Sequence, residues 1–189
     1  MIRSGQPLFL LAQAGLLLLT SLAAQAQQSE AISIRLSDVY TVPGTEAAIP
    51  IYLASQGQVQ VAEIGLEVSF PDDLLSFLRL ERAFQGFEKT AGKFEAESET
   101  GQDNRSTVRM KISIEKGDEP LLDGLIGYLM FQVDEKAKLG ETFLEVAELT
   151  LKSLSQEVVQ NTQSRGAKVI ILSEEDLLSA ITACFFYIH

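Results

Sequence analysis

The chain has almost no cysteine or histidine, two residues on which many enzyme and metal sites depend. Its 189 residues include one cysteine, Cys184, one histidine, His189, and no tryptophan. A lone cysteine closes no disulfide within the chain, and a histidine at the last position provides no partner for a serine or cysteine nucleophile and no zinc site inside the fold. A glycine-rich phosphate loop is also absent from the sequence. We therefore predict a protein that is not an enzyme.

Basic residues are scarce. The chain has 15 Lys and Arg against 26 Asp and Glu, so its net charge is −11 at pH 7. Such a surface repels nucleic acid and anionic lipid, and we expect neither as a partner. Neighbouring carboxylates occur at Asp72-Asp73 and between Asp118 and Asp123, where turn formation is the expected role. No cofactor is predicted. A structural calcium ion at Asp118–Asp123 is the alternative, although the spacing of a known calcium motif is missing.

Residues 1–26 have the three parts of an export signal. Arg3 gives a positive start, an apolar run extends from Leu8 to Thr20, and Ala24-Gln25-Ala26 is a small-x-small cleavage site. The run is shorter than the roughly 20 apolar residues that span a bilayer. We expect cleavage after Ala26 and a protein that is secreted, periplasmic or at the cell surface. An uncleaved N-terminal anchor is the alternative.

Apolar and polar residues alternate through most of residues 31–172. For example, Ile64, Leu66 and Val68 alternate with polar or small residues, which is typical of strands with one face on a core. Turn residues separate nine such segments, which are 31–40, 46–54, 60–70, 75–82, 91–98, 105–116, 124–134, 142–152 and 167–172. This pattern predicts an all-β, two-sheet antiparallel sandwich. Its expected core includes Ile64, Leu66, Val68, Met110, Ile112, Leu129 and Phe131.

Three segments, in this order, resemble the cohesin family over Ile32 to Leu172. They are Pro43-Gly44-Thr45 with Ile49-Pro50-Ile51, then Ile64 to Leu75, then Asp123 to Val133 with Ala137-Lys138-Leu139-Gly140. The resemblance implies a nine-stranded jelly roll related to carbohydrate-binding modules. It also implies a dockerin-like protein partner, bound by the sheet of the eighth, third, sixth and fifth strands. The family's contact positions on the third strand fall at Glu63 and Gly65, where cellulosomal members are expected to have Asn and Asp.

Protein recognition is therefore the predicted function, and a carbohydrate-binding module is the alternative. Polysaccharide is the less favoured ligand because sugar-binding faces stack rings on rows of Trp or Tyr. The expected domain has no Trp, and its tyrosines are only Tyr40, Tyr52 and Tyr128.

Two surfaces are candidates for binding. The first is a charged face with opposite charges on the third and sixth strands, and its residues are Glu63, Glu67, Arg109, Lys111 and Glu145. Cross-strand ion pairs are expected there, and a merely solvated sheet face is the alternative. The second is an apolar patch on the other sheet, predicted from an outward register of Tyr52, Ile126, Tyr128 and Met130. Soluble domains rarely leave such a patch uncovered.

Residues 173–189 form a separate tail. Ser173 and the acids after it predict a helix start, and Leu177 to Ile188 is almost wholly apolar. At about 18 Å, twelve helical residues are shorter than the roughly 30 Å hydrocarbon core. Three interpretations stay open: a helix that docks on the apolar patch, the stub of a membrane anchor or sorting tail, or a disordered end. Membrane contact is expected only through this tail.

Overall fold

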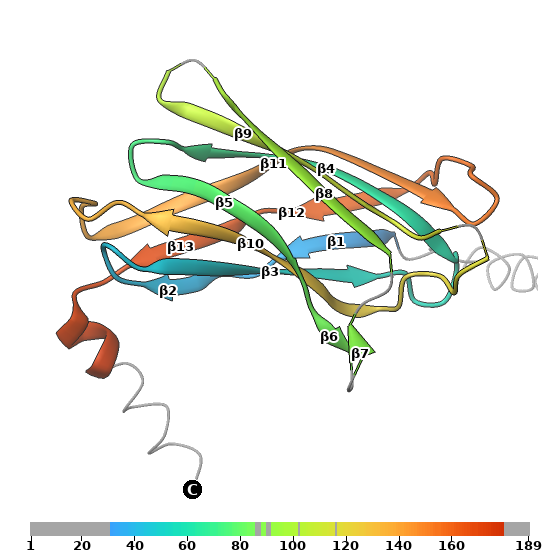
Figure 1. Ribbon diagram of the computed structural model, residues 1–189, viewed down its shortest axis with the longest axis horizontal. Coiled ribbons are helices and arrows are strands. Elements are labelled where there is room, and N and C mark those ends of the chain that lie inside the picture. Colours follow the sequence, from blue (N-terminus) through green and yellow to red (C-terminus); the bar gives the residue numbers. More distant parts are fainter. Residues whose placement is uncertain (1–30, 86–87, 90–91, 102, 116, 180–189) are drawn as a thin grey trace, which may run out of the picture. The chain divides into compact units, whose positions relative to one another are not determined.

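Most of the sequence from residue 31 onward folds into strands. The computed structural model describes residues 31–85, 88–89, 92–101, 103–115 and 117–179. Two sheets face each other, with a two-stranded ribbon beside them (Figure 1). The predicted signal over residues 1–26 and the last part of the tail, 180–189, lie outside the described residues. The all-β, two-sheet sandwich is confirmed.

The strands divide unequally between the two sheets. The five-stranded sheet has the order β12 (Thr162–Arg165), β1 (Ile32–Leu36), β3 (Glu46–Ala54), β10 (Gly124–Val133) and β5 (Leu75–Arg82). The six-stranded sheet has the order β2 (Val39–Thr41), β13 (Ala167–Ile171), β11 (Gly140–Ser153), β4 (Val61–Pro71), β9 (Arg105–Ser113) and β8 (Lys93–Thr100). The ribbon consists of β6 (Phe84–Gln85) and β7 (Glu88–Lys89).

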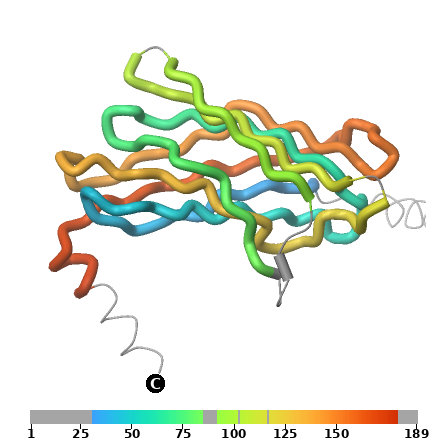
Figure 2. Tube along the Cα trace, viewed as in Figure 1, coloured from blue at the N-terminus to red at the C-terminus, as the bar shows by residue number. Residues whose placement is uncertain are grey.

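The chain changes sheet near each end of the sandwich, and it can be followed across both changes in Figure 2. The first predicted strand divides into β1 and β2, which lie in different sheets. The last predicted strand corresponds to β13 alone, and β12 lies in the segment before it, where no strand was predicted. Because β1 runs parallel to β12, and β2 runs parallel to β13, the sheets are mixed. The expectation of purely antiparallel sheets was therefore wrong for these two pairs.

Asp38 and Gly166 mark the points where the chain changes sheet. One Asp38 carboxylate oxygen accepts a hydrogen bond of 2.9 Å from the backbone N–H of Lys168, and the other lies 3.7 Å from Arg165. Gly166 passes so close to β11 that a Cβ there would collide with the carbonyl oxygen of Leu144. Only glycine fits this close approach.

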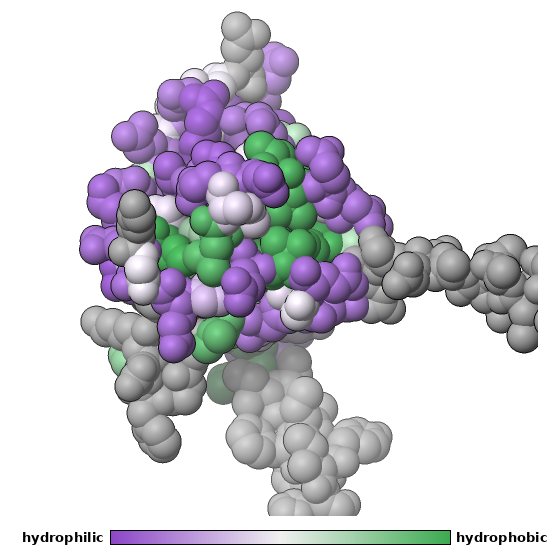
Figure 3. Space-filling model, turned by 90° about the vertical axis from the view of Figure 1, so that its right-hand side faces the viewer, coloured by the Kyte–Doolittle hydropathy of each residue, from purple (hydrophilic) through white to green (hydrophobic). Residues whose placement is uncertain are grey.

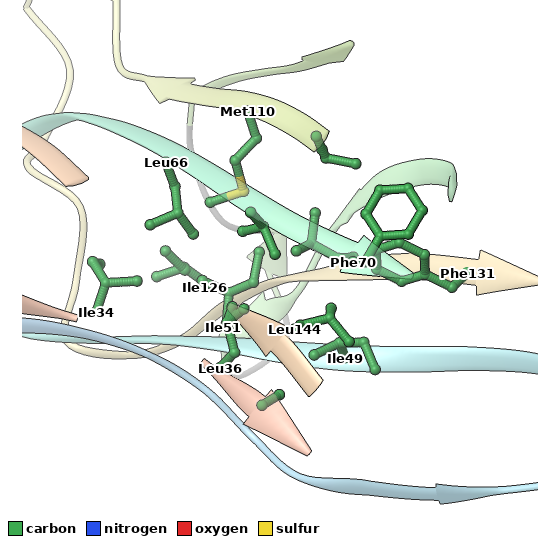
Figure 4. Close-up of a cluster of buried hydrophobic side chains, with 14 of the residues drawn as sticks. Ile34, Leu36, Ile49, Ile51, Leu66, Phe70, Met110, Ile126, Phe131 and Leu144 are labelled. Carbon is green, nitrogen blue, oxygen red and sulfur yellow. The ribbon is translucent and has the colours of Figure 1, made fainter. Parts of the chain in front are cut away.

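Apolar side chains from both sheets fill the space between them (Figure 4). Phe70 on β4 and Phe131 on β10 meet edge to face, with ring centres 5.0 Å apart. All seven residues of the predicted core are buried: Ile64, Leu66, Val68, Met110, Ile112, Leu129 and Phe131. The period of two therefore identified the core side of these strands correctly.

One end of the sandwich bears exposed apolar side chains. Figure 3 views this end, where hydrophobic side chains gather at the centre and hydrophilic ones surround them. The loops meet here through backbone hydrogen bonds from Leu154 to Gln60 and from Leu121 to Val61. Exposed side chains on these loops include Leu122, Leu154 and Val158.

A short helical segment follows β13. Residues 174–179 are helical, and the Ser173 hydroxyl accepts a hydrogen bond of 3.1 Å from the backbone N–H of Asp176. The predicted N-cap at Ser173 is thus confirmed. In the part of the chain that the structure describes, no helix has the length and apolar character needed to cross a membrane.

Candidate functional site

The outer face of the six-stranded sheet contains the predicted charged residues. Strands β11, β4, β9 and β8 lie side by side in the order that the cohesin resemblance implied for the eighth, third, sixth and fifth strands. Glu63 and Glu67 on β4 are opposite Ser113 and Arg109 on β9. Alternation along each strand directs the charged side chains outward while the apolar ones enter the core.

Glu63 is the centre of one group of charges. One of its carboxylate oxygens lies 2.7 Å from the Nζ of Lys152 on β11, and the other lies 3.0 Å from the Nζ of Lys111 on β9. Only 17% of the Glu63 side chain is exposed. The hydrogen bond from Lys152 lowers the pKa of Glu63 below its ordinary value. Partial burial opposes that shift, and the hydrogen bond from Lys111 adds to it.

Arg109 is the centre of a second group with the signs reversed. Its Nε donates to Glu67 on β4 at 2.9 Å, and its Nη1 donates to Glu99 on β8 at 2.7 Å. These hydrogen bonds and the nearby charges raise the pKa of Arg109. The two groups together connect all four strands, so the charged side chains of this face are held in defined positions.

The remaining predicted residue, Glu145, lies at the margin of the charged face. It lies 3.5 Å from Arg105, whose Nε donates to the Ser69 hydroxyl. A bulge at Ala147 interrupts the pairing of β11 with β4, and Glu145 and Glu148 are both exposed on either side of it. In an unbroken strand, residues three positions apart point to opposite faces. The bulge is therefore what places both Glu145 and Glu148 on the charged face.

Not every carboxylate on this face has a cation. None of the ion pairs formed within the described ranges involves Glu97 on β8 or Glu148 on β11. Both side chains are exposed. The face therefore combines internally paired charges with carboxylates that are free to meet a basic partner.

Sequence reasoning missed several residues of this face. Lys152 is the clearest case, because the alternation of β11 after the bulge would have placed it outward with Thr150. The exposed Phe143, two residues before Glu145 on β11, was also overlooked. Counting every second residue back from Glu145 gives Phe143, and counting forward from Glu148 gives Thr150 and Lys152. This count would have found both residues.

The predicted apolar patch is only partly present. A bulge between Leu125 and Gly127 turns Ile126 inward, where its side chain is 0% exposed and belongs to the core. The outward register predicted for Ile126 was therefore wrong, and Leu125 lies opposite Tyr52 instead. A bulge shifts the alternation by one residue, which reverses the face of the side chains before it.

Arginine side chains lie over much of what remains of the patch. Met130 is only 9% exposed, and Arg79 on β5 reaches across β10 to pair with Glu46 on β3 at 3.0 Å. The guanidinium of Arg35 lies 5.3 Å from the centre of the Tyr52 ring. Tyr52 and Tyr128 keep intermediate exposure. Docking of the Leu177 to Ile188 segment on this patch was one of the three open interpretations, and most of that segment lies outside the described residues.

Three of the loop carboxylates, Asp72, Asp118 and Asp123, have structural partners. Both oxygens of Asp123 accept backbone hydrogen bonds, from Ser55 at 2.7 Å and from Gln56 at 2.9 Å. Asp72 accepts a hydrogen bond of 3.0 Å from the Ser106 hydroxyl. Asp118 accepts one from the backbone of Glu115. Among the residues that the structure describes, no group of three or more His, Cys, Asp or Glu side chains is arranged to hold a metal ion.

Comparison with solved structures identifies the architecture. The OlpA cohesin of Clostridium thermocellum, solved in a type I cohesin–dockerin complex, matches with a TM-score of 0.61 over 76% of this chain and 100% of its own. The chain has the cohesin fold. The CaCohA2 cohesin of Clostridium acetobutylicum matches with a TM-score of 0.60 over 77% of this chain and 93% of its own. A non-cellulosomal cohesin of Archaeoglobus fulgidus matches with a TM-score of 0.58 over 79% of this chain and 97% of its own.

Sequence identity to these three cohesins is low, at 15%, 16% and 14% respectively. Neither a protein-family model nor a curated protein sequence matches the chain. The cohesin fold is therefore shared while most residues differ. Function depends on the surface residues, so it must be argued from this chain's own face.

Proposed function

We propose that this chain is an exported, non-enzymatic module that recognises another protein through the outer face of its six-stranded sheet. The observation that supports this most directly is the ordered charged face on β11, β4, β9 and β8. The matched cohesins in complexes bind dockerins. We propose a dockerin-like protein as the partner here as well.

The geometry of the face favours a protein over a polysaccharide. Ion pairs hold Glu63, Arg109 and their neighbours in place before binding, which reduces the ordering cost of forming an interface. Charged arrays of this kind steer partners of complementary charge and select among them. The residues on β4 and β9 that project from this face are charged or small, so they offer no row of rings for sugar stacking.

The two contact positions implied by the resemblance explain how the partner would differ from a cellulosomal dockerin. Glu63 is already paired with Lys111 and Lys152, and only 17% of its side chain is exposed to a partner. Gly65 offers no side chain, and a Cβ added at this position would lie 3.7 Å from the Cβ of Thr150. Recognition would therefore rely on charges around these positions rather than on an Asn and Asp pair.

The decisive experiment measures binding of purified dockerins, including the one from the OlpA complex, to the immobilised protein. We expect Arg109→Glu to weaken binding by at least about tenfold, because it breaks the two pairs that hold Glu67 and Glu99 in place and puts like charges side by side on the face. Arg79→Glu is the matched control because Arg79 also forms two ion pairs, on the other sheet. Its binding should equal that of the wild type.

Affinity electrophoresis on cellulose, chitin and xylan tests the competing function. Retention on a polysaccharide, together with no binding of any dockerin, would replace protein recognition by carbohydrate binding. Equal loss of binding in the Arg109 and Arg79 variants would move the interface away from the charged face.

A further inference from the structure

Phe143 is an aromatic side chain at the edge of the charged face. It is 49% exposed on β11, and Glu145 follows on the same side of the strand. The Nζ of Lys168 lies 5.8 Å from the centre of the ring and also pairs with Glu141 at 2.9 Å. The ring is thus held in position although half of its surface is open to solvent.

A groove of about 420 Å³ adjoins this ring. It is formed where β13 stops pairing with β11 at Leu144 and the chain crosses to the other sheet through Gly166. Phe143 and Val146 line it together with Arg165 and Lys168. The volume is within the roughly 300–1,000 Å³ of ordinary ligand sites, so it is ample for one apolar side chain of a partner.

The charges around the groove define what such a partner presents. Arg165 and Lys168 already pair with Asp38 and Glu141. On the other side, Glu145 has only a 3.5 Å pair with Arg105, and Glu148 forms no ion pair with any described residue. Glu145 shares the face of Phe143 by alternation, and the bulge at Ala147 brings Glu148 to the same face. The unneutralised charge beside the groove is negative.

We propose that the groove beside Phe143 receives an apolar side chain of the partner, flanked by lysine or arginine residues that meet Glu145 and Glu148. The inference rests on the proposed function and specifies the chemistry of the partner. Aromatic side chains are enriched at protein interfaces, and carboxylates beside the ring favour basic residues on the partner. Its position beyond β4 extends the binding surface towards β13.

The test uses a short synthetic peptide with one central leucine between pairs of lysines, titrated into the isotope-labelled protein and followed by NMR. We expect shifts at Phe143, Glu145 and Glu148. Replacing the central leucine by serine should weaken binding by at least about tenfold, as should Phe143→Ala, whereas Glu148→Lys should abolish it. Leu78→Ala is the matched control, because Leu78 is 41% exposed on the other sheet.

Thermal unfolding confirms that each variant keeps its fold. Equal affinity for the leucine and serine peptides, shifts elsewhere on the surface, or no shift at millimolar peptide would each overturn the proposal. Dockerin titrations of the same variants distinguish a failure of the groove proposal from a failure of protein recognition as a whole. If Arg109→Glu weakens dockerin binding while Phe143→Ala does not, protein recognition stands and the groove has no part in it.

Discussion

The Glu63 carboxylate on β4 lies 2.7 Å from the ammonium nitrogen of Lys152 on β11, although the two residues are 89 positions apart in the chain. With Lys111 on the other side, Glu63 connects three neighbouring strands at the middle of the charged face. This arrangement orders the candidate binding surface and also contributes to stability, and the two effects can be measured separately.

Glu63→Gln should lower the free energy of unfolding by about 1–2 kcal/mol at pH 7, because it removes a largely covered carboxylate that two ammonium groups share. The folded-state pKa of Glu63 lies below the unfolded value of 4.5. The contribution of Glu63 to the free energy of unfolding is therefore present above pH 4.5 and is lost as the pH falls through its folded-state pKa. Urea unfolding should show that the difference in free energy of unfolding between wild type and variant is smaller at acid pH than at pH 7.

The matched variant for this measurement is Glu97→Gln, which removes an exposed carboxylate outside the ion pairs of the described residues. Its stability should remain close to that of the wild type at every pH. A Glu63 difference that stays constant across the acid range would contradict the lowered pKa.

Leu129→Ala should cost about 2–5 kcal/mol, because Leu129 is fully buried between the sheets and its loss leaves a cavity. Urea unfolding provides the measurement. Leu78→Ala, on the neighbouring strand and substantially exposed, should change stability by less than about 0.5 kcal/mol. Similar losses in both variants would contradict the burial of Leu129.

Gly166→Ala should destabilise the fold by about 3 kcal/mol, because the added Cβ meets the carbonyl oxygen of Leu144 where the chain changes sheet. Gly65→Ala is the control, since the nearest atom to its Cβ lies at an ordinary 3.7 Å. Thermal unfolding should show a lower midpoint for the first variant and an unchanged or slightly higher one for the second. Wild-type behaviour of Gly166→Ala would mean that the crossover is looser than the structure shows.

Arg79→Ala should make Met130 more accessible, because the Arg79 side chain crosses β10 to reach Glu46. Oxidation by dilute peroxide, followed by mass spectrometry, should proceed faster at Met130 in the variant than in the wild type. Met110, only 3% exposed in the core, is the internal control and should react at the same slow rate in both proteins. An unchanged rate at Met130 would show that other groups cover it.

The alternation of residues predicted the sandwich well because each long strand has one face in the core and one in water. That is why the positions of Leu66 and Met110 could be assigned without coordinates. The same rule failed at Ile126, since a bulge inserts one residue and reverses the alternation locally. A bulge depends on how two strands meet, and the periodicity of one strand does not encode it.

The sequence by itself determined the all-β architecture, the core side of the long strands and the scarcity of histidine and cysteine, because these follow from local pattern and composition. Only the tertiary structure decided that Lys152 pairs with Glu63, that Arg79 crosses over to Glu46, and that the groove beside Phe143 opens where β13 leaves β11. Each of these depends on the register between strands that are distant in sequence. Register is set by the packing of the whole sandwich.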